Sequence, residues 1–551
     1  MNNYERMAEL LFPNINKTNQ DLEKIYPIRK KNPTVTRFAP SPTGFLHIGG
    51  VYTALINRSL ASGENDVFML RLEDTDKKRE VAGSRKIICD IFNKLGLKID
   101  EGVVNEFEEV GEYGPYVQSE RVEIYHIMAK YLVQKGYAYP CFCTEEDLAQ
   151  IREQQQALKV TPGYYGSYAK YRNITVEEAQ SLIEQNKNYV LRFRVSEDAP
   201  LRVTLSDLIR GDIEMENNFN DFVLLKENGI PTYHFAHACD DHFMRTTHVI
   251  RGEEWMASFP IHKQLFEALD FALPLYAHVA PVMKQEGESR RKLSKRKDPE
   301  ANAEFYLQEG YPNKALFVYL YTLINSNFEE WYLANKDASL NDFKVSFDNM
   351  QLSGALYDLS KLNSISSEII YEYDEEENTT NVINWAQEFN QELYNRLNND
   401  RDFVLKLMKT QGKNSMEHRK DLTHYGAFMD IFGIFYDDVF ASSQMPLDTL
   451  YENIKKEDLK TIIDGFKNYF NSLKSGEEIT LKDLAKELGY TDKKKFAKNP
   501  EMYRGVVFQF YKALRLLLTH SEHGISMDDV ISVLGHDRIM ERLEKGYQYG
   551  E

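Results

Sequence analysis

This sequence has few cysteines, no long apolar run and no excess of basic charge. Four cysteines in 551 residues are too few and too irregularly spaced for a disulfide framework, so we expect reduced thiols. The longest apolar run, residues 315–324, is far shorter than the roughly 20 residues needed to span a bilayer. With 67 basic and 85 acidic residues the net charge is −18, which argues against indiscriminate nucleic-acid binding, although a local basic face can still meet phosphate.

The rest of the composition is that of an ordinary globular protein. Hydrophobic residues make up 42% of the chain and charged residues 28%, a composition that indicates neither a disordered chain nor a membrane protein. A chain of 551 residues is too long for one core and predicts roughly three to five domains. No basic segment leads into an apolar stretch at the N-terminus, so we expect no secretory signal and a cytoplasmic location.

In the first part of the chain the hydrophobic pattern alternates between strands and helices. Residues 34–38 alternate like a strand, and after a loop a helical pattern continues until Gly63. Residues 67–72 predict a second, buried strand, and the amphipathic helix that follows ends at Gly96. This alternation predicts a parallel α/β sheet.

Further along the chain the pattern changes twice. From about residue 139 short strands predict an α+β insertion, and beyond about residue 300 helical periodicity dominates. The elements expected between these points are strands at 189–195, 222–225, 246–250 and 278–283, a turn at Asn228-Gly229 and a helix at 255–269. The pattern therefore predicts an α/β protein with an inserted module and all-α C-terminal domains.

A loop rich in glycine and proline joins the first predicted strand to the first predicted helix. Its sequence is Arg37-Phe-Ala-Pro-Ser-Pro-Thr-Gly-Phe-Leu-His47-Ile-Gly-Gly50. In a doubly wound sheet this is the position of a nucleotide. Gly44, Gly49 and Gly50 let a ligand approach the backbone, the helix N-terminus favours phosphate oxygens, and His47 can hydrogen-bond a phosphoryl group. The alternative is a tight turn with a structural histidine.

A dense basic run occurs inside this acidic protein, just after a predicted strand. Its sequence is Arg290-Arg-Lys-Leu-Ser-Lys-Arg-Lys297. Charge runs are usually solvated faces. Here the lysines can instead hold the β- and γ-phosphates of ATP and stabilise the charge that develops on pyrophosphate, a role that needs no proton transfer.

Together, in this order and across an insertion, the two segments resemble the HIGH and KMSKS motifs of class I aminoacyl-tRNA synthetases. The surrounding motifs resemble bacterial-type glutamyl-tRNA synthetases, strongly over residues 33–300. These motifs are Arg37-Phe-Ala-Pro-Ser-Pro-Thr-Gly44, Arg71-Leu-Glu-Asp-Thr-Asp76, Gly114-Pro-Tyr-Val-Gln-Ser-Glu-Arg121, Asp207-Leu-Ile-Arg-Gly-Asp212, Pro231-Thr-Tyr233 and Val249-Ile-Arg-Gly-Glu-Glu-Trp255. The segment Gly354-Ala-Leu-Tyr-Asp-Leu-Ser-Lys-Leu362 extends the resemblance weakly.

The resemblance implies a Rossmann-type, doubly wound parallel sheet with an α+β insertion, followed by all-α domains. The divisions that we expect are an N-terminal extension (1–32), the first half of the catalytic domain (33–117), an inserted acceptor-stem-binding domain (118–231), the second half of the catalytic domain (232–296), a stem-contact region (297–384) and a helical anticodon-binding region (385–551). It implies a monomeric glutamate–tRNA ligase that uses L-glutamate, ATP and tRNA(Glu), with tRNA(Gln) as an open alternative.

The same resemblance assigns site residues. The implied catalytic residues are His47, Lys292 and Lys295. ATP is expected to contact Gly44, His47, Gly49, Gly50, Leu293 and Lys295, and to bring its own Mg²⁺. Glutamate is expected to contact Arg37, Ser41, Glu73, Tyr233 and Arg251. Two arginines suit a dicarboxylic amino acid because a guanidinium offers planar, bidentate donors to a carboxylate.

Two positions depart from the family pattern. His237 stands where an asparagine is expected beside the amino-acid site, and Tyr52 replaces an arginine usually found after the first motif. These departures leave fine specificity open.

The pair Cys141 and Cys143 is half of a zinc site found in some relatives. Tyr168 and Lys170 occupy positions where the other ligands would be needed, and structural zinc normally takes four. We therefore expect no structural zinc and two ordinary thiols.

Three other interpretations remain open from the sequence. The cluster His234, His237, Asp240, Asp241 and His242 is compatible with a metal-dependent hydrolase or, more simply, with a buried hydrogen-bonding network beside the ATP pocket. A catalytically silent tRNA-binding paralogue is the second, and the intact lysines argue against it. The third concerns the basic and aromatic stretch from Lys493 to Leu518, which is either a solvated helix face or a surface for anticodon-loop phosphates and bases.

Overall fold

The computed structural model describes residues 1–294, 296–415, 417–472 and 480–550. The chain forms two compact units. The first unit contains residues 1–305 and 317–358, and the second contains residues 306–316 and the chain from Leu359 onward. Each unit is described by itself below. None of the helices in the described part of the chain combines the length and apolar character that a membrane span requires.

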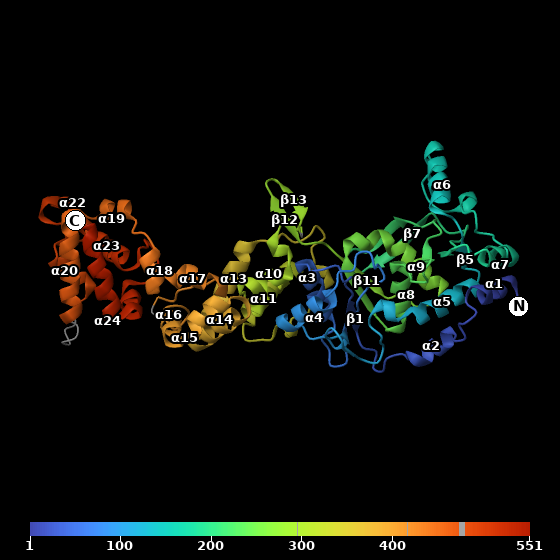
Figure 1. Ribbon diagram of the computed structural model, residues 1–551, viewed down its shortest axis with the longest axis horizontal. Helices are drawn as coiled ribbons and strands as arrows, with labels where there is room; N and C mark the ends of the chain where they lie inside the picture. The colour runs from blue at the N-terminus through green and yellow to red at the C-terminus, as the bar shows by residue number, and fades with distance from the viewer. Residues whose placement is uncertain (295, 416, 473–479, 551) are drawn as a thin grey trace. The chain divides into compact units, whose positions relative to one another are not determined.

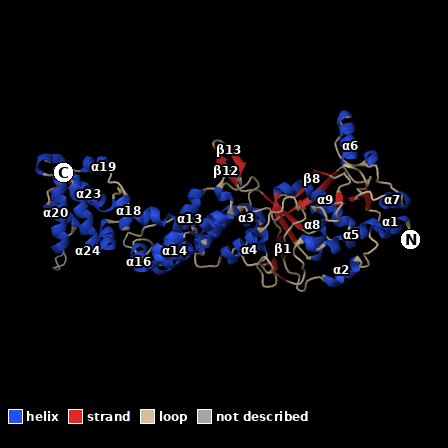
Figure 2. Cartoon of the chain, viewed as in Figure 1, coloured by secondary structure: helices blue, strands red, loops and turns tan. Residues whose placement is uncertain are grey.

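The first unit is built on one mixed sheet of eight strands, drawn in red in Figure 2. Their spatial order is β4 (Glu109–Val110), β3 (Glu101–Val103), β2 (Val67–Leu70), β1 (Val35–Phe38), β10 (His248–Gly252), β11 (Leu275–Val279), β7 (Arg202–Asp207) and β8 (Gly211–Glu216). The six central strands run parallel, and antiparallel strands β4 and β8 close the two edges. Every residue of β1 and β2 is buried, as expected for strands covered on both faces.

The strand order confirms the doubly wound sheet. From β1 the chain moves outward through β2 and β3, and after the insertion it returns to pair β10 with the other side of β1. The order therefore reverses between β1 and β10. In sheets of this kind a crevice opens at such a switch point, beyond the carboxyl ends of the strands.

Helices of the first unit flank this sheet and its insertion (Figure 1). They are α1 (Asn3–Leu11), α2 (Asn19–Ile25), α3 (Ile48–Leu60), α4 (Ser84–Leu95), α5 (Val122–Gln134), α6 (Glu145–Ala157), α7 (Val176–Glu184), α8 (Tyr233–Phe243) and α9 (Phe259–Ala268). The helices α10 (Ala303–Glu309) and α11 (Asn313–Ile324) lie where the chain passes between the units, and α12 (Phe328–Ala334) belongs to the first unit.

The segment 118–231, which we expected to form a separate insertion, is divided between two sheets. The strands β5 (Ala138–Cys141), β6 (Val190–Phe193) and β9 (Val223–Leu225) form a small antiparallel sheet of their own. The hairpin β7–β8 instead joins the main sheet, where Asp207 is in register with Tyr276 of β11. The small sheet of β5, β6 and β9 therefore accounts for only part of this segment.

Residues 1–32 belong to the first unit rather than standing apart from it. Helix α1 packs against α5 and α7, and Arg29 donates two hydrogen bonds to Glu101 at 2.6 and 2.8 Å. Glu23, in α2, accepts hydrogen bonds from His242, in the last turn of α8, at 2.6 Å and from Arg245, just after this helix, at 2.5 Å. The extension is therefore tied to the C-terminal end of α8.

A second departure from expectation lies after β11. The strand expected at 278–283 ends at Val279, and Pro281 follows, which has no N–H for a ladder. The chain then forms a hairpin of β12 (Met283–Glu286) and β13 (Ser289–Lys292), turning at Gly287 with φ +62°. The first part of the basic run therefore forms a strand.

In its described residues the second unit is helical apart from one pair of two-residue strands, β14 (Tyr490–Thr491) and β15 (Gly505–Val506). Its helices are α13 (Leu359–Glu372), α14 (Glu375–Phe389), α15 (Gln391–Asn399), α16 (Arg401–Met408), α17 (Phe428–Phe432), α18 (Asp437–Ser442), α19 (Leu447–Asn453), α20 (Lys456–Ser472), α21 (Leu481–Glu487), α22 (Lys493–Lys498), α23 (Val507–Thr519) and α24 (Met527–Gly546). The chain passes between the units at 305/306, 316/317 and 358/359.

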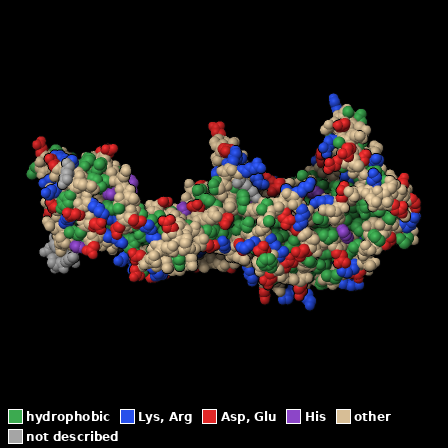
Figure 3. Space-filling view, viewed as in Figure 1, with side chains coloured by type: hydrophobic (Ala, Val, Ile, Leu, Met, Phe, Trp, Pro, Cys, Tyr) green, Lys and Arg blue, Asp and Glu red, His purple; other side chains and the backbone are tan. Residues whose placement is uncertain are grey.

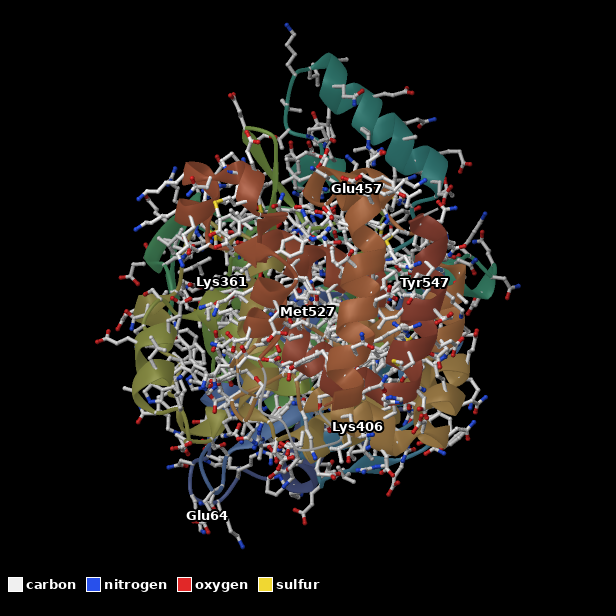
Figure 4. All side chains as sticks on the ribbon, turned by 90° about the vertical axis from the view of Figure 1, so that its left-hand side faces the viewer. Glu64, Lys361, Lys406, Glu457, Met527 and Tyr547 are labelled. Atoms are coloured by element: carbon white, nitrogen blue, oxygen red, sulfur yellow. The ribbon has the colours of Figure 1, made fainter. Side chains whose placement is uncertain are left out.

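One continuous hydrophobic core runs from Ile370 to Leu543 and holds the second unit together. Figure 4 looks onto these helices and labels Glu457 at the start of α20, Met527 at the start of α24 and Tyr547 just after its end. The ammonium group of Lys467, in α20, lies 4.6 Å from the centroid of the Tyr547 ring. This contact joins the C-terminal half of α20 to the residue that follows α24.

Candidate active site

A cavity of about 500 Å³ opens at the switch point, beyond the carboxyl ends of β1 and β10. Most of its walls come from residues that the sequence motifs singled out. Its lining includes Arg37, Ser41, His47, Gly49, Gly50, Glu73, Tyr233, Arg251, Lys292 and Leu293. All five predicted glutamate-binding residues are therefore in one cavity, together with most of the predicted ATP-binding residues.

One wall is the N-terminus of α3. His47 is the N-cap of this helix, and its Nδ1 accepts a hydrogen bond from the Gly49 N–H at 2.9 Å. Its Nε2 therefore carries the proton and faces the carbonyl oxygen of Leu293 at 3.3 Å. A Cβ atom on Gly50 would lie 3.0 Å from Leu46 and 3.2 Å from Phe38, so only glycine fits without displacement. This end of the cavity suits a phosphate group.

Gly44 is the predicted ATP-binding residue that lies elsewhere. Among the described residues it does not line the cavity, and its N–H donates to Ser84 Oγ at 3.0 Å. Its φ of +109° shows that glycine is needed there for the turn of the loop. Lys295 lies outside the described residues.

The hairpin β12–β13 brings the basic run to the cavity. Figure 3 shows acidic side chains at the tip of the projecting hairpin and basic side chains nearer its base. Lys292, more than half exposed, has its Nζ 3.4 Å from Glu254 Oε1, and both residues line the cavity. The surface ion pair is weak enough for an incoming phosphate to replace it.

Asp298 fixes the base of this hairpin, a role that the sequence analysis did not identify. Its carboxylate accepts hydrogen bonds from Arg291 at 2.6 and 2.9 Å, from Lys284 at 2.9 Å and from the Ser294 N–H at 2.8 Å. The hydrogen bonds from Arg291 hold the pKa of Asp298 well below its ordinary value. The carboxylate therefore ties both strands of the hairpin to the loop that leads to Lys295.

Arg37, at the end of β1, has its charge balanced inside the protein. Its Nε donates to Asp241 Oδ1 at 3.1 Å, and the same oxygen accepts from Arg71 Nη1 at 2.6 Å. Arg71 also donates to Glu73 Oε1 at 3.1 Å. Burial alone would raise the pKa of Asp241, but the two guanidinium groups hold it well below its ordinary value. One buried carboxylate therefore anchors two arginines.

Arg251, near the end of β10, differs from Arg37 in how its charge is balanced. Its side chain is buried, and among the described residues no carboxylate lies within ion-pair distance of it. It contacts the Tyr233 hydroxyl at 3.4 Å, the Trp255 carbonyl at 3.3 Å and the imidazoles of His262 and His278 at 3.1 and 3.0 Å. A cation surrounded by neutral groups favours a ligand that brings a negative charge.

The two departures from the family pattern lie at different depths. Tyr52 is buried and lines the cavity. His237 is fully buried and does not line the cavity. Its Nδ1 lies 3.0 Å from Asp241 Oδ2, and its Nε2 lies 2.8 Å from the Tyr276 hydroxyl. Burial lowers the pKa of His237 to about 3, so the imidazole is neutral at physiological pH.

The His/Asp cluster is spread over several partners. Asp240 accepts hydrogen bonds from Arg121 at 2.6 Å, from Gln118 at 2.9 Å and from the Tyr125 hydroxyl at 2.9 Å. Within the described ranges, no three His, Cys, Asp or Glu side chains are grouped as a metal site would require. The cluster is the buried hydrogen-bonding network that the sequence offered as the simpler interpretation.

The two thiols of the insertion meet one hydroxyl. Cys141 Sγ and Cys143 Sγ lie 3.3 and 3.4 Å from Tyr164 Oη. Lys170, at one expected ligand position, has its Nζ 3.5 Å from Asp147. The pair packs inside a small core of the insertion that includes Tyr139.

Comparison with known proteins gives the same class as the fold. A family model described as tRNA synthetases class I (E and Q), catalytic domain, matches residues 33–363, and one described as an anticodon binding domain matches residues 402–547. With a switch-point cavity between a first-strand loop and a basic hairpin, the fold and site define a class I aminoacyl-tRNA synthetase.

Similar proteins narrow this class. A glutamate–tRNA ligase of Clostridium perfringens is 44% identical over 98% of this chain and 99% of its own length, and one of Acetivibrio thermocellus is 43% identical over 98% and 99%. A crystal structure of a glutamate tRNA ligase from Elizabethkingia meningosepticum, in complex with its amino acid, is 27% identical with a TM-score of 0.68 and covers 94% of this chain and 99% of that one. The chain belongs to the glutamate–tRNA ligase family.

Proposed function

We propose that the cavity of the first unit activates L-glutamate with ATP and transfers it to tRNA. In the first step an oxygen of the α-carboxylate attacks the α-phosphorus of ATP, and pyrophosphate leaves. In the second step a hydroxyl of the terminal ribose of tRNA attacks the activated carbonyl carbon, and AMP leaves. Mg²⁺ arrives bound to ATP and is part of the substrate.

One observation carries this proposal: a buried arginine that has no counterion among the described residues shares a cavity with a helix N-terminus. Arg251 offers its charge to the glutamate side chain, whereas Arg37 is already balanced by Asp241. Replacing the substrate carboxylate with an amide would remove a charge-assisted hydrogen bond and leave Arg251 unpaired, which favours glutamate over glutamine.

The phosphates belong at the other end of the cavity. His47 and the N–H groups at the start of α3 lie there, and hairpin β12–β13 presents Lys292 beside them. We assign Lys292, and Lys295 in the same run, to the charge that develops on pyrophosphate. Most of the catalysis then comes from positioning and from fixed positive charge rather than from proton transfer.

We place tRNA on both units. The small sheet of the insertion is assigned to the acceptor stem, and the helices from residue 402 onward to the anticodon. Exposed lysines of α22 (Lys493, Lys494, Lys495) and the exposed ring of Phe508 support this assignment, because phosphate contacts and stacked bases are how proteins read single-stranded RNA. We propose that the enzyme works as a monomer in the cytoplasm.

Charging with labelled glutamate tests the function and the tRNA range together. The full-length protein is incubated with ATP, Mg²⁺ and either a tRNA(Glu) or a tRNA(Gln) transcript, and acid-precipitable label is counted. We expect label on tRNA(Glu). Label on both transcripts would show a non-discriminating enzyme, and label on neither, with an active control enzyme, would contradict the proposal.

A further inference from the structure

Arg251 donates hydrogen bonds to two histidines that do not line the cavity. Its Nε donates to His278 Nε2 at 3.0 Å, and its Nη1 donates to His262 Nδ1 at 3.1 Å. Tyr233 and Trp255, which contact the Nη atoms, do line the cavity. Both Nη atoms therefore contact residues of the cavity wall, while His278 binds Nε and His262 binds Nη1 from outside that wall.

The first histidine is fixed by a carboxylate. His278 Nδ1 donates to Asp207 Oδ2 at 2.7 Å, and the same oxygen accepts the His278 N–H at 3.0 Å. The other oxygen of Asp207 accepts the N–H groups of Ile209 and Arg210, both at 3.0 Å, in the turn between β7 and β8. Asp207 is the first residue of the motif 207–212, to which the proposed reaction assigns no role.

The second histidine is fixed by a third. His262, in α9, lies with its Nε2 3.0 Å from Nδ1 of His234, in α8. Both rings also pack against Tyr233, with centroids 5.8 and 5.6 Å from that ring. The elements α8, α9, β10 and β11 therefore all contribute to holding one side chain.

The chemistry of arginine fixes the protons in this network. A guanidinium has only donors, so His278 must offer a lone pair at Nε2 and His262 must offer one at Nδ1. Each imidazole is then neutral and in one tautomer: Nδ1–H for His278, donating to Asp207, and Nε2–H for His262, donating to His234. Burial lowers the pKa of both histidines, which agrees with this assignment.

We propose that Asp207–His278 and His234–His262 are two positioning pairs that orient Arg251 for the substrate carboxylate without neutralising its charge. This inference rests on the proposed function. In each pair the atom that accepts from Arg251 is a neutral imidazole nitrogen. The pairs therefore fix the plane of the guanidinium, and its positive charge stays available to the ligand. A carboxylate in either position would fix the arginine equally well but would compete with the substrate.

Matched substitutions of His278 and His262 distinguish the effect of the hydrogen-bond acceptor from the effect of side-chain volume. His278→Gln places an amide oxygen near the position of Nε2, and His262→Asn places one near the position of Nδ1, so both retain the acceptor. His278→Phe and His262→Phe retain a ring and remove it. All four variants are made in the full-length protein, and their melting temperatures are compared with the wild type.

The readout is glutamate-dependent exchange of labelled pyrophosphate into ATP, in the presence of tRNA. We expect both Phe variants to raise the KM for glutamate about tenfold or more, because a hydrogen bond to a charged group is lost. The Gln and Asn variants should stay within about threefold of the wild type, and the KM for ATP should stay unchanged in all four. Equal effects of Phe and of the acceptor-retaining residue, or parallel losses for ATP, would overturn the inference.

A measurement without substrate distinguishes a failure of this inference from a failure of the proposed function. Nitrogen-15 NMR of the imidazoles in the wild-type protein distinguishes the two neutral tautomers from the imidazolium, and the Gln and Asn variants assign the signals. We expect neutral Nδ1–H for His278 and neutral Nε2–H for His262 near neutral pH. An imidazolium or the opposite tautomer would overturn the inference, whereas a wild-type enzyme inactive with glutamate would overturn the proposed function.

Discussion

At the scale of single residues, the site is organised by how each buried charge is balanced. Arg37 and Arg71 share Asp241, whereas Arg251 is surrounded by neutral groups. Arg37 and Arg251, the two arginines that line the cavity, therefore have different roles. Arg37 is part of a paired structural network that a ligand can also contact, and Arg251 supplies the charge that a ligand completes.

His237 makes the free energy of unfolding depend on pH. Its pKa is about 3 in the folded protein, far below the ordinary value of about 6.5, because burial disfavours the imidazolium. Between these two values the unfolded chain binds a proton that the folded chain does not, so stability falls as the pH falls through this range.

We expect the variant His237→Asn to flatten this dependence. The slope of the unfolding free energy against pH, measured by urea denaturation between pH 5 and 7, should decrease by up to about 1.4 kcal/mol per pH unit. The wild type serves as the control, and the slope is compared rather than the level, because the substitution also changes packing. Identical slopes would show that His237 is not the buried neutral group described above.

Single residues stand out in the sequence where a motif carries them, whereas a pair that spans distant segments does not. Arg37, Tyr233 and Arg251 stand out because each belongs to a recognisable motif at a strand or helix end, and all three line the cavity. The contact between Asp207 and His278 depends on β7 lying next to β11, with Asp207 in register with Tyr276. No local pattern specifies that neighbour relation, since the hairpin β7–β8 was expected to lie in a separate module.

At the scale of elements, the least predictable piece is the hairpin that carries the basic run. Its strands are mostly exposed and rich in charge, so they lack the alternation of apolar and polar residues that reveals a strand. The local signal was Gly287 between two glutamates, which marks the turn. By contrast, β1, β2 and α3 were predicted within a few residues because they are buried and regular.

The hairpin gives a prediction about Asp298. We expect Asp298→Asn to slow pyrophosphate exchange about tenfold, because the loss of charge weakens the bonds to Arg291 and Lys284 and loosens the loop that follows.

A matched control for this variant is Glu286→Gln. Glu286 contacts the same Arg291 at 3.0 Å but lies at the exposed tip of the hairpin. Exchange rates are measured for both variants beside their melting temperatures. A rate for Asp298→Asn as high as that of the control would show that the anchor does not matter for catalysis.

At the scale of the whole molecule, the chain is divided into a unit that contains the cavity and a helical unit with its own core. The net charge of −18 says little about tRNA, because basic side chains are concentrated locally, in the hairpin β12–β13 and in α22. The composition identified a multidomain globular protein, but only the motifs indicated a class. Residues 1–32, which had no assigned role, are bound to the end of α8 through Glu23.

The most direct test of the account is glutamate-dependent pyrophosphate exchange by the full-length protein and by its variant Arg251→Gln, in the presence of tRNA. The account predicts rapid exchange by the wild type and a KM for glutamate raised about a hundredfold in the variant, with the KM for ATP unchanged, because only the substrate carboxylate loses its partner. An unchanged KM for glutamate in Arg251→Gln would contradict it.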